Sequence, residues 1–313
     1  MAKHRQNPPQ LGGDLYLTDG GLETTLVFHE GLDLPCFASF DLLKDDAGVE
    51  MLLDYYRRYV AIARELGVGF VIESVTWRSN PDWGRKLGYS PEALAEANRQ
   101  AIELCVRVRE EVESPSLPTV ISGCIGPQGD GYSPETMMSE QEAEAYHREQ
   151  IDVFAETDAD MVTAATMTYP AEAIGATRAA QAVGMPAVIS FTVETDGRLP
   201  DGSTLREAIL RVDEATGEGP VYYMINCAHP THFADVLPPD EAWTERIRGL
   251  RANSSTKSHA ELDEATELDE GDPDDLAAHH RALRQALPRL NVVGGCCGTD
   301  HRHVGAIGRA WLS

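Results

Sequence analysis

Long apolar runs, nucleotide-binding glycine patterns and lysine are scarce or missing in this sequence. No stretch of 18 or more apolar residues is present, so we expect no membrane-spanning helix. Neither a G-x-G-x-x-G pattern nor a Walker loop occurs, so the sequence gives no support to nucleotide chemistry. Only four lysines occur, and the formal net charge of −25 argues against nucleic acid and anionic membranes as partners.

The first 13 residues are polar, contain two prolines and lack the apolar segment of a signal peptide. We expect residues 1–13 to form a flexible lead and residues 14–313 to form a single domain. With 313 residues, 42% of them hydrophobic, the chain is long enough for one large α/β domain. The six scattered cysteines do not indicate a disulfide scaffold, so we expect a reducing, cytoplasmic location.

Three of the cysteines directly follow apolar runs. Cys227 follows Asn226, and Cys296 and Cys297 lie in the segment Gly-Gly-Cys-Cys-Gly-Thr of residues 294–299. A single cysteine is usually a small buried hydrophobic residue, but the glycines around this pair indicate an unusual backbone. A disulfide between the two adjacent cysteines is not expected, because neighbouring residues rarely reach the required geometry. If the two strands are neighbours, three thiolates converge and leave one position of a tetrahedral zinc open, as in catalytic sites.

Short apolar strands alternate with amphipathic helices about eight times along the chain. This alternation is typical of parallel β-structure, and the number of units favours a single closed (β/α)8 barrel of the TIM type over an open sheet. Residues 261–275 contain nine acids and no base, which predicts an exposed loop or linker. The predicted strands cover residues 15–17, 70–72, 119–121, 161–164, 187–191, 221–225, 247–252 and 290–293.

Residues capable of chemistry stand at the ends of these predicted strands. In a (β/α)8 barrel the functional site forms at the C-terminal ends of the strands, so the side chains found there line one mouth of the barrel. The residues at the predicted strand ends are Asp19, Glu73, Cys124, Cys227, Cys296 and Cys297.

Four segments occur here in the order in which they occur in homocysteine S-methyltransferases: Asp19-Gly20-Gly21, residues 123–127 (Gly-Cys-Ile-Gly-Pro), Asn226-Cys227 and residues 294–299. The chain resembles this family, which includes the betaine–homocysteine and S-methylmethionine–homocysteine enzymes, over nearly its whole length. The resemblance implies a (β/α)8 barrel that binds Zn²⁺ through Cys227, Cys296 and Cys297. It also implies that Asp19 lies beside the bound thiol amino acid.

The chain departs from the family pattern in the predicted amino-acid pocket. After the fourth strand the family has a glutamate that holds the amino group of the substrate, and Ala165 stands at the matching position. After the second strand, Glu73 and Trp77 stand where the family has small polar residues and a tyrosine. Either Glu73 supplies the missing carboxylate, or the acceptor is a thiol other than homocysteine. The predicted substrate-binding residues are Asp19, Gly20, Glu73, Trp77 and Asn226.

The predicted activity is zinc-dependent transfer of a methyl group from a sulfonium or ammonium donor to a thiol acceptor. The acceptor is homocysteine, which would give methionine, or a related thiol. Zinc deprotonates a coordinated thiol, and three protein thiolates keep that sulfur nucleophilic. Trp77, Trp83 and Tyr169 are candidates for contact with the methylated cation, because an aromatic face attracts cations. The expected partners are therefore small molecules, and the sequence indicates no oligomeric state.

Three alternatives belong to other classes. The chain could be a thiol-methylating half-module that works with a separate corrinoid protein, since it contains no D-x-H-x-x-G corrinoid motif of its own. The altered pocket would also suit a non-catalytic zinc-binding barrel. A zinc hydrolase is a poor match, because activated water calls for harder ligands than three thiolates and for a nearby general base.

Overall fold

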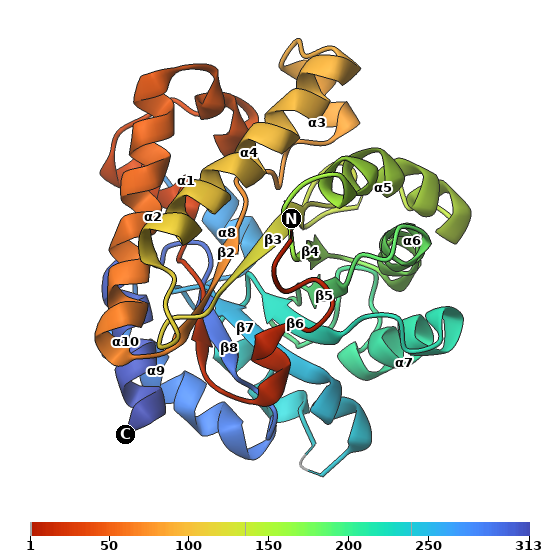
Figure 1. Cartoon of the computed structure of the whole chain (residues 1–313). Coiled ribbons are helices and arrows are strands. Elements are labelled where there is room, and N and C mark those ends of the chain that lie inside the picture. Colours follow the sequence, from red (N-terminus) through yellow and green to blue (C-terminus); the bar gives the residue numbers. More distant parts are fainter. Residues whose placement is uncertain (1, 135, 239) are drawn as a thin grey trace.

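The computed structural model describes residues 2–134, 136–238 and 240–313. Eight parallel strands close into a barrel in which each strand pairs with the next along the chain, and β8 returns to β1 (Figure 1). The predicted (β/α)8 barrel is therefore confirmed. The strands are β1 (Tyr16–Leu17), β2 (Gly69–Glu73), β3 (Thr119–Ile125), β4 (Met161–Met167), β5 (Ala187–Phe191), β6 (Tyr222–Asn226), β7 (Ile247–Ala252) and β8 (Val292–Gly295).

Helices surround the barrel, and their ends follow the local sequence signals. Helix α4 begins after Ser90, whose hydroxyl accepts a hydrogen bond from the backbone of Ala93, and α2 ends at Gly67 in the left-handed conformation. Three short helices, α1 (Leu22–Thr24), α3 (Pro81–Lys86) and α8 (His259–Asp263), lie in the strand-to-helix loops. The longer helices are α2 (Asp46–Leu66), α4 (Pro91–Val112), α5 (Glu140–Ala155), α6 (Pro170–Ala182), α7 (Leu205–Thr216), α9 (Pro273–Ala282) and α10 (His301–Leu312).

The strands are buried on both faces and separate two apolar layers. One layer fills the space between the strands and the helices and contains most of the buried apolar side chains. The other lies inside the barrel, where alternate residues of the strands point inward. This inner layer consists of Tyr16, Val71, Val120, Met161, Val188, Tyr222, Met224 and Val292. Because apolar side chains fill the middle of the barrel, polar side chains at the strand ends can meet only at its mouth.

The N-terminal segment, residues 2–13, lies against the barrel, and its red ribbon crosses the strands in Figure 1. Arg5 donates hydrogen bonds to the carbonyls of Ala155 (2.9 Å) and Thr157 (2.8 Å), and Gln10 is fully buried against Met161 of the inner layer. These contacts contrast with the flexible lead expected for residues 1–13.

The acidic segment 261–275 is part of the barrel mouth. The Asp269 carboxylate accepts a hydrogen bond from Ser255 (2.8 Å) and pairs with Lys257 (3.2 Å), and the Glu270 carbonyl accepts one from His303 (2.8 Å). Many of its side chains are exposed, as expected, but Leu262, Leu268 and several acids line the central cavity. The segment is an exposed or half-buried stretch that forms a wall of the site rather than a linker.

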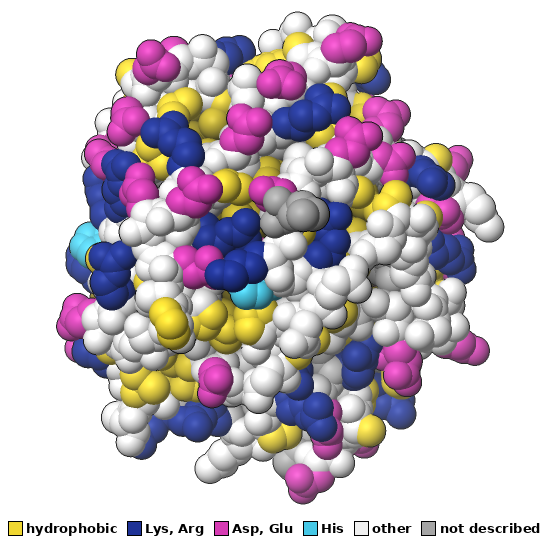
Figure 2. Space-filling model, in the orientation of Figure 1, with side chains coloured by type: hydrophobic (Ala, Val, Ile, Leu, Met, Phe, Trp, Pro, Cys, Tyr) yellow, Lys and Arg dark blue, Asp and Glu magenta, His cyan; other side chains and the backbone are white. Residues whose placement is uncertain are grey.

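The surface carries charges of both signs. Figure 2 shows acidic and basic side chains interspersed over one face of the molecule. Surface ion pairs, such as Lys3 with Glu113 (2.6 Å), join charges of opposite sign. No helix in the described part of the chain is long and apolar enough to cross a membrane.

Candidate metal centre and substrate cavity

Strand β7 brings three cysteines together. The backbone N–H of Cys227, just after β6, donates to the Arg251 carbonyl (3.0 Å), and that of Cys296, just after β8, donates to the Ala252 carbonyl (2.8 Å). Because β7 lies between β6 and β8, its two edges hold the two cysteine segments at one level. The sulfur atoms of Cys227, Cys296 and Cys297 all lie within 4.8 Å of one another.

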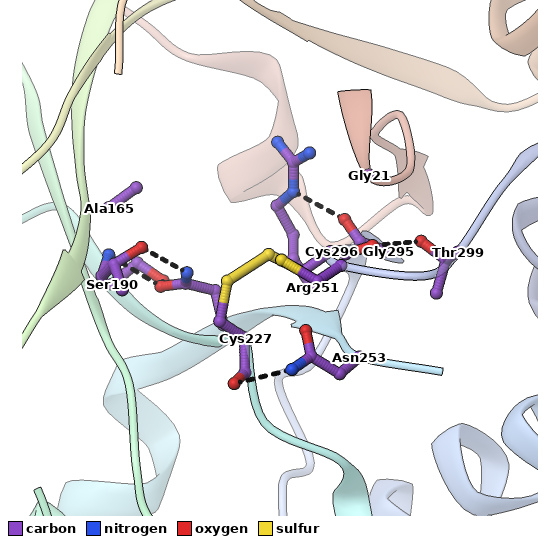
Figure 3. Close-up of a disulfide and its surroundings, with 12 residues drawn as sticks. Gly21, Ala165, Ser190, Cys227, Arg251, Asn253, Gly295, Cys296 and Thr299 are labelled. Atoms are coloured by element: carbon purple, nitrogen blue, oxygen red, sulfur yellow. Dashed lines mark hydrogen bonds between the residues drawn. A yellow bond between two sulfur atoms is a disulfide. The ribbon is translucent and has the colours of Figure 1, made fainter. Parts of the chain in front are cut away.

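The sulfur atoms of Cys227 and Cys296 are joined as a disulfide (Figure 3). Cys297 is a free thiol. The expectation of three unpaired thiols is not met in this form. A disulfide offers no thiolate to a metal, so the form that fits a metal is the reduced one. Three soft sulfur donors then suit zinc, and Asn253 Oδ1, buried without a hydrogen-bond partner among the described residues, is an oxygen donor nearby.

Local backbone geometry fixes both cysteine segments. Cys227 has a φ of 55°, in the left-handed region that favours glycine, and its carbonyl accepts hydrogen bonds from Asn253 Nδ2 (3.0 Å) and His259 Nε2 (2.6 Å). Gly298 has a φ of 77°, and a side chain there would collide with Ser254. The turn at Gly298 lets the next residue, Thr299, donate its hydroxyl to the Cys296 carbonyl (2.7 Å). The positions of the sulfurs are thus set by hydrogen bonds to their own backbone.

A buried arginine on β7 ties the mouth of the barrel together. Arg251 Nη2 pairs with Asp19 Oδ1 (2.6 Å), and Nη1 pairs with Glu73 Oε2 (2.6 Å). Nε donates to the carbonyl of Gly295 (3.0 Å), the residue before Cys296, and Nη2 also reaches the carbonyl of Gly20 (3.1 Å). One guanidinium therefore links the ends of β1, β2, β7 and β8.

Burial and neighbouring charges shift the pKa values of the groups at the barrel mouth. Burial raises the pKa of Asp19 to about 6, although the nearby Arg251 opposes this shift. Burial alone lowers the pKa of Arg251, but the carboxylates of Asp19 and Glu73 outweigh it, so the net shift is upward. Burial also raises the pKa of the Cys297 thiol to about 11. Without a bound cation this thiol therefore stays protonated at neutral pH.

Asn226 and Gly20 make hydrogen bonds to other residues at the mouth of the barrel. Asn226 Oδ1 accepts hydrogen bonds from Thr166 N (2.9 Å) and Ser190 Oγ (2.6 Å), and Asn226 Nδ2 donates to Thr166 Oγ1 (2.9 Å). Both polar atoms of this amide are engaged, so Asn226 holds the ends of β4, β5 and β6 together beside Cys227. The Gly20 carbonyl accepts from Tyr55 (3.1 Å) and from Arg251. The hydrogen bonds of the described residues use one of the two N–H groups of Asn226 Nδ2, and the predicted roles of Asn226 and Gly20 in substrate binding stay predictions.

Glu73 and Trp77 line the cavity, but neither is free in the way the sequence suggested. Glu73 Oε2 pairs with Arg251, so a substrate amine would share this carboxylate with a guanidinium, and the role of Glu73 as a replacement for the family glutamate stays a prediction. Trp77 stacks on the Arg78 guanidinium, 4.3 Å from the ring centroid, and donates its indole N–H to the Ala165 carbonyl (3.4 Å). Trp77 is therefore not a bare aromatic face for a methylated cation.

The two other aromatic candidates lie outside the cavity lining. Trp83 contacts Arg78 on one side and Lys86 on another, at 4.0 and 3.9 Å from its ring centroid. The hydroxyl of Tyr169 accepts a hydrogen bond from the backbone of Met138 (3.0 Å). An aromatic residue that the sequence did not single out, Tyr132, does face the metal centre.

Tyr132 stands over the free cysteine. Its hydroxyl lies 3.8 Å from Cys297 Sγ, and its ring packs on that of His259 with 4.2 Å between centroids. His259 in turn donates to the Cys227 carbonyl and lies 3.4 Å from Glu194. Tyr132 and His259 thus cover the three cysteines from the β3–α5 and β7–α9 loops.

The cysteines open into a cavity of about 440 Å³ at the C-terminal mouth of the barrel. The β1–α2 loop, the β3–α5 loop and the acidic segment form its walls. Acidic side chains outnumber basic ones in the lining, so the cavity carries a negative potential that attracts cations. The charged residues of the lining are the acids Asp19, Glu23, Glu73, Asp130, Asp263, Glu267 and Asp269, and the arginines Arg78 and Arg251.

Two further groups among the described residues bring three possible ligand atoms together. In one of them Arg302 pairs with both Glu270 (3.0 Å) and Asp300 (2.7 Å), so a guanidinium already supplies the positive charge. In the other, Asp275 is 66% exposed, unlike the enclosed cysteines. These groups are His29, Glu270 and Asp300, and His229, Asp275 and His279.

The model of the homocysteine S-methyltransferase family matches residues 16–311, which is nearly the whole chain. The chain belongs to this family. It is accordingly a methyltransferase, as its resemblance to the family implied.

Individual relatives agree with this assignment. The chain is 25% identical to homocysteine S-methyltransferase 4 of Zea mays, over 95% of this chain and 90% of that protein. Its fold is similar to that of the homocysteine methyltransferase MmuM from Escherichia coli in the metallated form, with a TM-score of 0.72 and 20% identity over 95% and 96% of the two chains. The oxidized form of MmuM gives a TM-score of 0.71 at 18% identity.

Sequence reasoning missed Arg251, Arg78, Tyr132 and His259. Arg251 left one signal, because it is a charged residue between the apolar Leu250 and Ala252 at a predicted strand end. A charge at such a position is buried and needs a partner. Tyr132 and His259 lie in loops without periodicity, and nothing in their neighbourhood distinguishes them from solvated loop residues.

Proposed function

We propose that the chain transfers a methyl group from a cationic sulfonium or ammonium donor to a thiol, with Cys227, Cys296 and Cys297 as ligands of a zinc ion. The observation that carries the proposal is the meeting of three sulfur atoms at the mouth of a cavity large enough for small molecules. When bound, zinc would hold the sulfur of the acceptor as a thiolate at neutral pH.

The protein supplies orientation and charge. Tyr132 and the acidic segment enclose the cysteines, so the reacting sulfur is shielded from water, while hydrogen bonds from Asn253 and His259 fix the Cys227 segment. The acid-rich lining favours a donor that carries a positive charge, and this charge disappears when the methyl group leaves. No general acid or base is needed, because the donor departs as a neutral molecule.

Homocysteine is the acceptor that the family assignment supports, and the altered pocket extends the proposal to related thiols. Ala165 cannot pair with an ammonium group, and Glu73 is engaged with Arg251. Asp19 also pairs with Arg251, but its carboxylate shares this guanidinium with that of Glu73. Two carboxylates facing one guanidinium leave a net negative charge, which is the remaining attraction for a substrate amine in this part of the cavity.

The test is a matrix of thiols against methyl donors, with reduced, zinc-loaded protein and detection of the products by mass. The thiols are homocysteine and shorter or des-amino analogues, and the donors are sulfonium and quaternary ammonium compounds. We expect a methylated thiol and a demethylated donor in equal amounts, only with reduced and zinc-loaded protein. Equal turnover by zinc-free protein would contradict the role of the metal, and no product with any pair would contradict the proposed reaction.

A further inference from the structure

Arg78 is a buried cation in the wall of the cavity. It is only 9% exposed, and its guanidinium lies between the rings of Trp77 and Trp83, 4.3 and 4.0 Å from their centroids. Its one hydrogen bond in the described part of the chain runs from Nη1 to the Gly129 carbonyl (2.7 Å). Stacking on aromatic rings holds an arginine in a fixed orientation and leaves the edge of its guanidinium available to a ligand.

This cation has no carboxylate partner. Among the described residues no acid lies within 4.0 Å of it, and its Nε–H is buried without an acceptor. Asp130 and Glu23 act on it only from a longer range, and burial lowers the pKa of Arg78. A buried charge without a partner is costly, and a ligand that supplies the counter-charge removes this cost.

Arg78 lines the same cavity as the three cysteines. Its neighbour Trp77 donates to the carbonyl of Ala165, the position where the family resemblance places a glutamate that holds the substrate amine. Tyr132, which contacts Cys297, lies close enough to Arg78 for each residue to shift the pKa of the other. A small molecule with its sulfur at the cysteines can therefore extend past Tyr132 towards Arg78 within one cavity.

We propose that Arg78 binds the carboxylate of the thiol acceptor. This inference rests on the proposed function for the identity of the acceptor as a thiol. Ala165 stands where the family has a carboxylate, and Arg78 is an unpaired cation in the same cavity. The cavity therefore binds the carboxylate of the acceptor more strongly than its amine. The substrate class is thus a mercapto-carboxylic acid, with or without an α-amino group.

The experiment compares Arg78→Gln with the matched control Arg85→Gln, which removes an exposed arginine from the adjacent helix α3. The acceptors are homocysteine, 4-mercaptobutanoate, which lacks the amine, and 3-mercaptopropylamine, which lacks the carboxylate. We expect Arg78→Gln to raise KM for both carboxylates by about 10- to 100-fold, the value of a hydrogen bond to a charged group. KM for the amine and the kcat values should change little, Arg78→Lys should recover part of the loss, and Arg85→Gln should match the wild type.

Direct binding separates this inference from the proposed function. Calorimetry with reduced, metal-loaded protein and the same three thiols needs no donor and no turnover. Carboxylate-dependent binding that Arg78→Gln abolishes supports the role of Arg78 even if no methyl transfer is found. Equal weakening of all three thiols would overturn it. If Arg78→Gln does not fold, the wild type alone decides, because equal affinity for 4-mercaptobutanoate and 3-mercaptopropylamine contradicts the proposal.

Discussion

The two sides of the barrel mouth are built differently. On the side of β6, β7 and β8, backbone hydrogen bonds place three cysteines, and the sequence there follows the family motifs closely. On the side of β2, β3 and β4, aromatic rings and charges form the wall, and the sequence departs from those motifs at Glu73, Trp77 and Ala165. In the proposed function, the cysteine side therefore supplies the metal chemistry, and the opposite side selects the thiol.

The two buried arginines of the cavity show this difference most clearly. Arg251 donates to two carboxylates and two backbone carbonyls, so its role is to hold the site together. Arg78 donates to one carbonyl and is held by stacking, so it can still receive a ligand. The same residue type serves as a structural link on one side and as a binding group on the other because its partners differ.

Removing a sulfur from the metal side should have the largest effect. Cys296→Ser should reduce bound zinc to below about a tenth of an equivalent per chain, because the affinity depends on all three thiolates. The control is Cys36→Ser, since Cys36 is a free, exposed cysteine outside the cavity lining. Zinc would be measured by elemental analysis after loading under reducing conditions. Full zinc content in Cys296→Ser would contradict the ligand assignment.

Replacing Arg251 should lower the free energy of unfolding. Arg251→Gln leaves the buried carboxylates of Asp19 and Glu73 without their cation, and we expect a loss of about 3–5 kcal/mol in the free energy of unfolding. The control, Arg246→Gln, breaks a more exposed pair with Asp213, and we expect it to cost about 1 kcal/mol. Urea unfolding of the reduced proteins measures both. Similar losses in the two variants would contradict the claim that Arg251 stabilises the fold more than a partly exposed arginine does.

Restoring the family glutamate should change acceptor preference by a smaller amount. Ala165→Glu places a carboxylate next to Trp77, where it can pair with a substrate amine and compete for Arg78. We expect the ratio of kcat/KM for homocysteine to that for 4-mercaptobutanoate to rise about 10-fold. Ala165→Gln, which has the same shape without the charge, is the control. An unchanged ratio in Ala165→Glu would place the amine elsewhere in the cavity.

The smallest expected effect is a change in pH dependence. The pKa of Asp19 is raised to about 6 in the folded protein, above its value in the unfolded chain, so the folded state holds this proton more tightly. The contribution of Asp19 to stability is therefore present at low pH and falls as the pH rises from about 4 to about 6. In Asp19→Asn, the unfolding free energy measured over this range should fall less steeply. The same pH dependence of the unfolding free energy in the wild type and in Asp19→Asn would contradict the raised pKa of Asp19.

Much of the barrel could be predicted because its signals are local. The apolar runs predicted all eight strands, including Ile247–Ala252. The level of the cysteines followed from the same rule, since the strands of a parallel barrel end at one mouth. The boundary of the flexible lead and the role of the acidic segment were harder, because polar composition alone does not say what a segment packs against.

The sequence by itself determined the strand and helix pattern, the family motifs and the three cysteines at strand ends, because each of these depends on residues close together in the chain. Only the tertiary structure decided which charges are paired and which are free. Arg251 meets Glu73 across 178 residues, and the Cys227–Cys296 disulfide spans 69. Arg78 stacks on the indoles of its chain neighbours Trp77 and Trp83, and among the described residues the fold brings no carboxylate within 4.0 Å of its guanidinium. Such pairings depend on barrel closure, which brings distant strand ends together and which no local pattern encodes.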